Sequence, residues 1–191
     1  MPQFNLNLTF AVTSMFMALS VQASPQVEIV TSKGLIVIEL DSQKAPISSA
    51  NFVKLVNSRQ YVGTIFHRVI PEFMIQGGGY TENLSEKPTQ GNIKNESKNG
   101  LKNLRGTVAM ARNSDPQSAS AQFYINTVDN GNLDYPSFDG WGYAVFGKVV
   151  NGMEVVDAIS ATTTKNLSPE FANLPVNSIT IKSAKVIAES K

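Results

Sequence analysis

The sequence predicts a mainly β protein: one domain built as a closed or nearly closed antiparallel β-barrel with two helices. Short runs rich in Val, Ile, Phe and Tyr recur along the chain and are separated by glycine, proline and asparagine. Only two segments place apolar residues at helical spacing. The length of 191 residues and the hydrophobic content of 42% suit a single domain with one sizeable core.

The first elements are a hairpin and a helix. β-Branched runs at Val27–Thr31 and Leu35–Leu40 flank Ser32-Lys33-Gly34, which predicts two antiparallel strands joined by a tight turn. A helix is expected from Ala45-Pro46, because proline is tolerated in a first turn. Its apolar positions at helical spacing are Ile47, Ala50, Val53 and Leu55 or Val56. This helix should cover one end of the barrel.

Six further strands and a second helix complete the predicted fold. The strands are expected at Thr64–Val69, Met74–Gln76, Thr107–Ala111, Gln122–Asn126, Ala144–Val149 and Ile179–Ile187. The second helix is predicted at Met153–Ile159. Residues 79–105 are polar and predict a long surface loop without core residues. The triplet Gly77–Gly79 predicts a turn with positive φ that ends a strand, since no helix signal follows to make a phosphate site.

The amino-terminal segment predicts a signal peptide at residues 1–23, followed by the domain at 24–191. Residues 1–27 contain no charged side chain, and Phe10–Val21 form a short apolar run that ends in Val21-Gln22-Ala23, before Ser24-Pro25. This pattern favours cleavage after Ala23 and export to the periplasm, although no Lys or Arg precedes the run. An uncleaved apolar start is the alternative. The run falls short of the roughly 20 residues that a membrane-spanning helix needs.

Composition excludes several classes of function. A net charge of +1 argues against a nucleic-acid surface. The chain has no cysteine and a single histidine, His67, so thiol catalysis and histidine-rich zinc sites are excluded. No cofactor-binding motif occurs, and we expect no cofactor and no metal. Near-neutral charge and the lack of a long amphipathic surface helix make a monomer the expectation.

The segment Phe66–Gly78, which reads FHRVIPEFMIQGG, has the composition of a binding pocket. Strand alternation predicts that Phe66, Arg68 and Ile70 share one face and that His67 lies on the other. A partly buried arginine without a nearby acid needs either a distant carboxylate or a ligand. From the residues alone, a structural ion pair is the first reading. His67 is interpreted as structural.

This segment resembles the signature of the cyclophilin-type peptidyl-prolyl isomerases. Three further stretches resemble that family in order and spacing: Gly106–Arg112 (GTVAMAR), Ser120–Asn126 (SAQFYIN) and Tyr143–Val149 (YAVFGKV). The resemblance extends from about Val27 to Val186 and is greatest to exported bacterial members. It implies an eight-stranded closed antiparallel barrel capped by two helices.

The resemblance also implies a site and a reaction. Arg68 would be the catalytic donor to a twisting X-Pro bond. The substrate groove would be lined by Phe73, Met74, Gln76, Ala111, Gln122, Tyr124, Leu133 and Tyr143. The implied partners are proline-containing unfolded or partly folded polypeptides. Without the resemblance, Phe73, Met74 and Leu133 would be interpreted as barrel core. A proline-binding module with incidental isomerase activity is the alternative function, and a hydrolase or metal enzyme lacks its nucleophile or ligands.

Four positions depart from the family pattern. Asn132 stands where many eukaryotic members have a tryptophan that bonds cyclosporin, so weak cyclosporin binding is expected. Tyr143 replaces a common histidine, as in bacterial relatives. Tyr124 replaces phenylalanine and adds a hydroxyl that needs a partner. Glu72 replaces a glycine and could pair with Arg68 or face solvent. Trp141 is interpreted as a peptide contact or a packing anchor outside the site.

Overall fold

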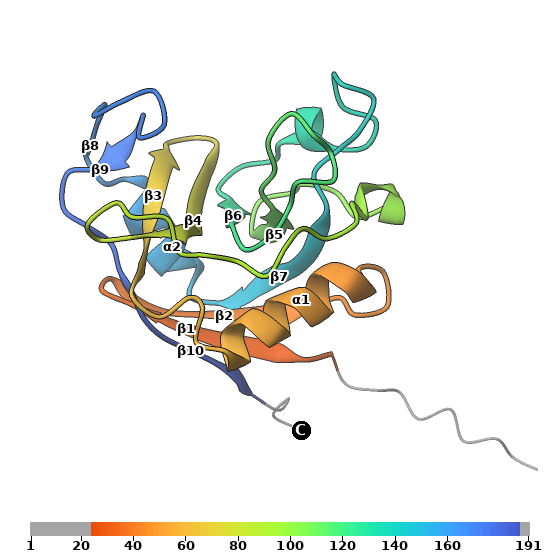
Figure 1. Cartoon of the computed structure of the whole chain (residues 1–191), viewed down its shortest axis with the longest axis horizontal. Helices are drawn as coiled ribbons and strands as arrows, with labels where there is room; N and C mark the ends of the chain where they lie inside the picture. The colour runs from red at the N-terminus through yellow and green to blue at the C-terminus, as the bar shows by residue number, and fades with distance from the viewer. Residues whose placement is uncertain (1–23, 188–191) are drawn as a thin grey trace, which may run out of the picture.

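The computed structural model describes residues 24–187, which form one curled β-sheet with two α-helices (Figure 1). The larger elements are β1 (Gln26–Thr31), β2 (Gly34–Leu40), α1 (Pro46–Asn57), β3 (Thr64–Ile70), β4 (Met74–Thr81), β5 (Thr107–Met110), β6 (Phe123–Asn126), β7 (Val145–Asn151), α2 (Met153–Ser160) and β10 (Ile181–Ile187). The smaller ones are the 3-10 helices η1 (Ser97–Asn99) and η2 (Gly131–Leu133) and the strands β8 (Thr164–Lys165) and β9 (Leu174–Pro175). The predicted signal peptide lies outside the described residues.

The eight-stranded antiparallel sheet has the order β10-β1-β2-β7-β5-β6-β4-β3. Its two edges meet only briefly, at a single bridge between Ile65 and Thr180 and at two backbone bonds nearby. Gly63 N–H donates to Ile181 O and Phe66 N–H donates to Ile179 O, both at 2.9 Å. The predicted mainly β fold with eight strands and two helices is confirmed. Closure is less complete than expected, because a short seam replaces a full ladder.

The interior of the sheet is filled by aromatic and branched side chains. Phe52 from α1 lies 5.0 Å from Tyr61 and 5.3 Å from Phe123, measured between ring centroids. Tyr61 satisfies its buried hydroxyl by donating to Ala121 O at 3.0 Å. The helix α1 packs against β7 and β10, and α2 packs against β2, β3 and β4.

The buried face of α1 differs from the predicted face. Ile47 and Ala50 are exposed, and the buried positions are Ser48, Ser49, Phe52, Leu55 and Val56. The two serines are tolerated inside because their hydroxyls have acceptors. Ser48 Oγ donates to Glu96 Oε2 at 2.7 Å, and Ser49 Oγ lies 3.4 Å from Phe146 O. Polar residues with partners can therefore occupy a face that hydrophobicity alone would assign elsewhere.

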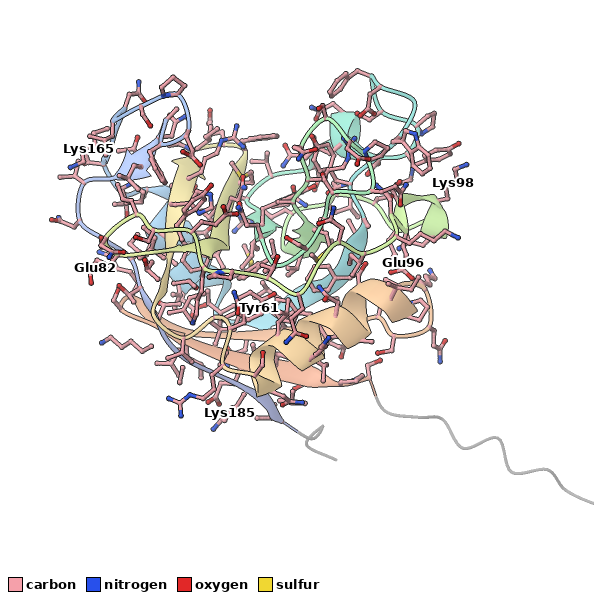
Figure 2. All side chains as sticks on the ribbon, in the orientation of Figure 1. Tyr61, Glu82, Glu96, Lys98, Lys165 and Lys185 are labelled. Carbon is pink, nitrogen blue, oxygen red and sulfur yellow. The ribbon has the colours of Figure 1, made fainter. Side chains whose placement is uncertain are left out.

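The start of α1 is capped from far along the chain. Its N-cap residue, Ala45, has no side chain that can accept a hydrogen bond. Glu96 supplies both acceptors: Ile47 N–H donates to Oε1 at 2.9 Å and Ser48 N–H donates to Oε2 at 2.7 Å. Figure 2 shows Glu96 above the first turn of this helix. The carboxylate also lies at the positive end of the helix dipole.

The prediction that residues 79–105 lack core residues is wrong. Tyr80 continues β4, and Asn95, Ser97 and Asn103 are buried. Asn95 Nδ2 donates to Pro116 O at 3.0 Å and to Gly142 O at 3.1 Å, so it joins this segment to two others. Asparagine can satisfy loop backbone groups inside a protein, and that role leaves no hydrophobic signal in the sequence.

The predicted turn at Gly77–Gly79 is also wrong, because β4 continues through the glycines to Thr81. Gly78 does have positive φ, at 88°, and a Cβ there would lie 2.9 Å from the Tyr61 ring. A Cβ on Gly79 would lie 2.5 Å from Cγ of Gln122. The glycines therefore allow two side chains to approach the strand closely.

Candidate active site

A bulge in β3 sets the direction of Arg68. The β3–β4 pairing passes from Phe66–Gly77 to Arg68–Gln76, so two residues of β3 oppose one residue of β4. Phe66 consequently points into the barrel core together with Val69, while Arg68 faces a pocket on the other side. The prediction that Phe66 and Arg68 share a face is wrong for this reason.

The pocket that Arg68 faces has a volume of about 160 Å³. Eight of the nine residues assigned by the resemblance surround it: Arg68, Phe73, Met74, Gln76, Ala111, Tyr124, Leu133 and Tyr143. They come from β3, β4, β6 and η2 and from the segments just before β4, just after β5 and just before β7, which are distant in sequence. The ninth residue, Gln122, lines an adjoining cavity of about 310 Å³ that shares Gln76 and Ala111 with the first.

One wall of the pocket is apolar. Met74, Tyr124 and Leu133 are buried and belong to a cluster that is separate from the barrel core. Phe73 packs against this cluster and is partly exposed. The wall therefore presents apolar surface to the cavity while its backing remains closed to water.

The pocket is also lined by the positively charged Arg68 and the amide of Gln76. Arg68 Nη1 donates to Gln76 Oε1 at 3.3 Å, and Gln76 Nε2 donates to Gln122 Oε1 at 2.9 Å. No ion pair within residues 24–187 involves Arg68, so the expected structural ion pair is absent from this part of the chain. Burial lowers the pKa of Arg68 and neighbouring Tyr143 opposes the effect, yet a guanidinium remains charged at neutral pH. The site therefore holds a half-buried cation whose side-chain contact among the described residues is one long hydrogen bond to an amide.

The hydroxyl that Tyr124 adds relative to phenylalanine forms a hydrogen bond. Tyr124 Oη donates to Asn103 Oδ1 at 2.8 Å, and Asn103 N–H donates to Asp134 Oδ1 at 2.7 Å. Burial is the main cause of the raised pKa of Tyr124. Asn103 is 1% exposed and supports the pocket from behind. Sequence reasoning missed it because it lies in the segment that was interpreted as a surface loop.

Arg112 was also missed as a lining residue, although it ends the quoted motif Gly106–Arg112. It borders both cavities, and its side chain is 2% exposed. Its Nη2 lies 2.7 Å from Asp139 Oδ2, and its guanidinium lies 4.4 Å from the centre of the Tyr143 ring. Arg112 is thus neutralised and stacked, whereas Arg68 remains available to a ligand.

The remaining singled-out residues lie outside the pocket. His67 is 3% exposed and packs against Tyr80 at 4.8 Å between ring centres. Burial, followed by the charge of Arg68, lowers the pKa of His67 to about 4. Glu72 is exposed, has φ of 56° and forms no ion pair with Arg68. Asn132 is exposed, and Trp141 is half-buried beneath Lys98.

Within residues 24–187, no cluster of three His, Asp or Glu is arranged to hold a metal ion. No helix in the same range is long and apolar enough to span a bilayer.

Comparison with known proteins identifies relatives along nearly the whole chain. A family model described as "Cyclophilin type peptidyl-prolyl cis-trans isomerase/CLD" matches residues 26–186. Peptidyl-prolyl cis-trans isomerase A of Dickeya dadantii is 52% identical over 177 residues, which are 93% of this chain and 92% of the relative. Peptidyl-prolyl cis-trans isomerase B of Escherichia coli is 48% identical over 158 residues, which are 82% of this chain and 96% of the relative.

Solved structures agree with these sequence matches. A crystal structure of a Cryptosporidium parvum cyclophilin type peptidyl-prolyl cis-trans isomerase superposes with a TM-score of 0.71 at 26% identity, covering 87% of this chain and 99% of that one. A structure of the same protein in the presence of the dipeptide Ala-Pro gives 0.70 at 26% identity, covering 86% and 99%.

Proposed function

The chain belongs to the cyclophilin-type peptidyl-prolyl cis-trans isomerases, and we propose that Arg68 is the residue that lowers the barrier to rotation. The reaction is rotation about an X-Pro bond in a polypeptide. Amide resonance opposes this rotation with a barrier of roughly 18–20 kcal/mol, so the uncatalysed process takes tens to hundreds of seconds. No covalent intermediate is required. The enzyme needs to bind the twisted amide more tightly than either planar isomer.

The single observation that carries the proposal is that no carboxylate among residues 24–187 pairs with the Arg68 guanidinium. When the amide twists, the prolyl nitrogen becomes pyramidal and regains a lone pair that accepts a hydrogen bond. A fixed guanidinium can donate to this nitrogen, to the carbonyl oxygen or to both, and its effect is greater where water is excluded. The described residues offer Arg68 only Gln76 at 3.3 Å, so a substrate competes with a weak contact rather than with a carboxylate.

The apolar wall holds the proline ring while the preceding carbonyl group rotates. Phe73, Met74 and Leu133 provide a surface on which a pyrrolidine ring packs, and Tyr124 closes the base. Burying the ring contributes on the order of 1–2 kcal/mol. A structural relative was crystallised in the presence of the dipeptide Ala-Pro, which agrees with proline-containing peptides as the proposed ligands.

The two linked glutamines orient the peptide backbone. Gln76 and Gln122 are hydrogen-bonded to each other at 2.9 Å, and both line the larger cavity, where each keeps hydrogen-bonding capacity. Peptide backbone offers both donors and acceptors, so this pair can bind substrates of different sequence. Unfolded or partly folded proline-containing chains of the envelope or secreted proteins are the proposed substrates. Export rests on the uncharged apolar segment at residues 1–23.

Replacing Arg68 tests the mechanism. Isomerisation of an Ala-Pro-Phe reporter peptide is measured with the chain from Ser24 and with Arg68→Ala and Arg68→Lys. Loss of a preorganised donor lowers kcat/KM about 100-fold or more in Arg68→Ala. Arg68→Lys keeps the charge without the planar fork and is expected to recover only part of the activity.

The control for this experiment is folding, monitored by circular dichroism. Activity of folded Arg68→Ala within a few-fold of the wild type would contradict the mechanism. A folded wild type that binds the reporter but does not exceed the uncatalysed rate would indicate the alternative function, a proline-binding module.

A further inference from the structure

The loop at residues 134–142 carries three aromatic side chains and lies in the sequence between two residues that line the pocket, Leu133 and Tyr143. It joins η2 to the start of β7 and rises above η2 at the upper right of Figure 1. We call it the aromatic loop. Phe138 is 88% exposed, the largest value among the exposed large hydrophobic residues of 24–187. Tyr135 and Trp141 are half-buried.

The aromatic loop is held in place by its own contacts. Ser137 Oγ donates to Asn132 O at 2.7 Å, and Trp141 N–H donates to Asp139 Oδ1 at 3.0 Å. Asp139 Oδ2 pairs with Arg112 Nη2 at 2.7 Å. A segment anchored in this way presents Phe138 without a large cost in conformational entropy when something binds to it.

Lys98 forms cation–π contacts with Tyr135 and Trp141, the other two aromatic residues of the loop. Its Nζ lies 5.0 Å from the centre of the Tyr135 ring and 5.3 Å from that of Trp141. Figure 2 labels Lys98 on the same side of the molecule as the aromatic loop. The two rings are therefore engaged by a cation. Phe138 remains an apolar group facing solvent, whereas the other two rings of the loop lie under the Lys98 ammonium group.

The aromatic loop is continuous with the substrate pocket. Arg112, which anchors Asp139, lines the pocket, and Tyr143, directly after the loop, lines it as well. We propose that Phe138 binds an apolar or aromatic side chain of the same polypeptide whose X-Pro bond occupies the pocket. This inference rests on the proposed function and defines its substrates further, as extended chains that carry an apolar residue several positions from the proline.

The charges of the loop and the length of an extended peptide favour an apolar side chain of the substrate as the group that contacts Phe138. Both acidic residues of the loop are neutralised, since Asp139 pairs with Arg112 and Asp134 lies 3.5 Å from Lys102. The surface around Phe138 thus favours an apolar partner over a basic one. An extended chain spans roughly 3.3 Å per residue, so a side chain about five positions from the proline reaches some 16 Å from the pocket.

Peptide binding tests the inference independently of catalysis. The probes are unstructured, fluorescently labelled peptides of about 16 residues with one Ala-Pro bond and either Phe or Ser about five positions before or after the proline. Fluorescence anisotropy measures Kd for the chain from Ser24. An aromatic pair makes the wild type prefer one Phe peptide over its Ser counterpart by about three- to tenfold.

Three variants assign the preference to the loop. Phe138→Ser is expected to remove it, and Phe138→Trp is expected to retain it. Leu167→Ser is the matched control, because Leu167 is 58% exposed but lies in the β8–β9 turn, and it should leave the preference unchanged. Isomerisation of the Ala-Pro-Phe reporter, which is too short to reach Phe138, should be unchanged in Phe138→Ser.

Several results would overturn the inference. They are a wild type without a Phe preference, a preference that survives Phe138→Ser, a dimer in light scattering that Phe138→Ser dissociates, or binding to phosphatidylglycerol vesicles that the same change abolishes. A wild type that fails to isomerise the short reporter would instead overturn the proposed function. The preference for Phe peptides would still test the loop.

Discussion

His67 is the only histidine of the chain and directly precedes the residue that we propose as the catalytic donor. It is buried, its Nδ1 has no hydrogen-bond partner among residues 24–187, and its pKa is lowered to about 4. The cause is burial first and the charge of Arg68 second, with Glu170 opposing them. His67 is therefore neutral at physiological pH and contributes to packing against Tyr80 rather than to proton transfer.

This burial predicts a pH-dependent stability. Between about pH 6.5 and 4 the unfolded chain binds a proton at His67 that the folded chain does not bind, so the free energy of unfolding falls as the pH falls. The stability at about pH 5 should be about 2 kcal/mol lower than at about pH 7 on account of this residue. Urea unfolding of the wild type and of His67→Phe measures the difference. Because carboxylates titrate equally in both proteins, an identical pH slope in the two would refute the assignment.

Asn132 is the basis of a second prediction, which concerns the affinity for cyclosporin. Its side chain is exposed beside the pocket residue Leu133, and its carbonyl accepts a bond from Ser137, so a larger side chain fits without displacing core. Since the indole donor and its apolar face are missing, we expect cyclosporin to bind weakly. Asn132→Trp should tighten binding at least about tenfold, an aromatic contribution of about 1.4 kcal/mol. Isothermal titration calorimetry measures both proteins, and a nanomolar Kd for the wild type would contradict the prediction.

At the scale of elements, α1 depends on a carboxylate from another segment. Glu96→Ala removes both acceptors from Ile47 N–H and Ser48 N–H and should lower the free energy of unfolding by about 1–2 kcal/mol. Glu96→Gln keeps an acceptor oxygen and should lose less. Thermal unfolding detects the effect as a decrease in Tm of roughly 2–4 °C per kcal/mol.

Glu154→Ala is the matched control for this cap. Glu154 lies exposed in the first turn of α2 and contributes only the general dipole effect, so its loss should cost less than about 0.5 kcal/mol. Equal losses for the two glutamates would show that charge, and not the specific bonds of Glu96, stabilises α1.

Elements were predicted correctly where the hydrophobic pattern repeats without interruption. The predictions failed where one residue breaks the pattern. The hairpin β1–β2 and the helix α2 were found because their apolar periods are uninterrupted. The facing of Arg68 was wrong because the bulge opposite Gln76 shifts the alternation by one residue. The sequence of β3 alone does not predict that bulge, because the bulge depends on how β3 pairs with β4. Family resemblance identified the pocket residues because it does not depend on alternation.

At the scale of the whole molecule, the pocket exists because the curled sheet brings distant segments together. Arg68 and Tyr143 are 75 positions apart and line the same cavity. Contacts of this kind arise from sheet order, and composition and periodicity contain no information about them. Buried polar links such as Asn103 with Tyr124 and Asp134 were missed for the same reason, since their partners are only defined in the folded chain.

Export of the chain is a prediction that also belongs to the whole molecule. The run Phe10–Val21 matches the apolar region of a signal peptide, and small residues precede Ser24. In a Gram-negative host the chain should be recovered from the periplasmic fraction with Ser24 as its first residue, as read by N-terminal sequencing. Ala23→Arg should block cleavage, because the cleavage site requires a small residue.

The unusual absence of Lys and Arg before the apolar run allows a sharper test of export. The α-amino group is the only positive charge there, so Gln3→Lys should accelerate processing in a pulse-chase experiment. A protein without cysteine then enters an oxidising compartment with no thiol to be misoxidised. Recovery of the chain in the cytoplasm with Met1 intact, and without any response to Gln3→Lys, would show that the apolar segment does not direct export. The proposed substrates would then be cytoplasmic polypeptides, while the Arg68 mechanism would stand on its own test.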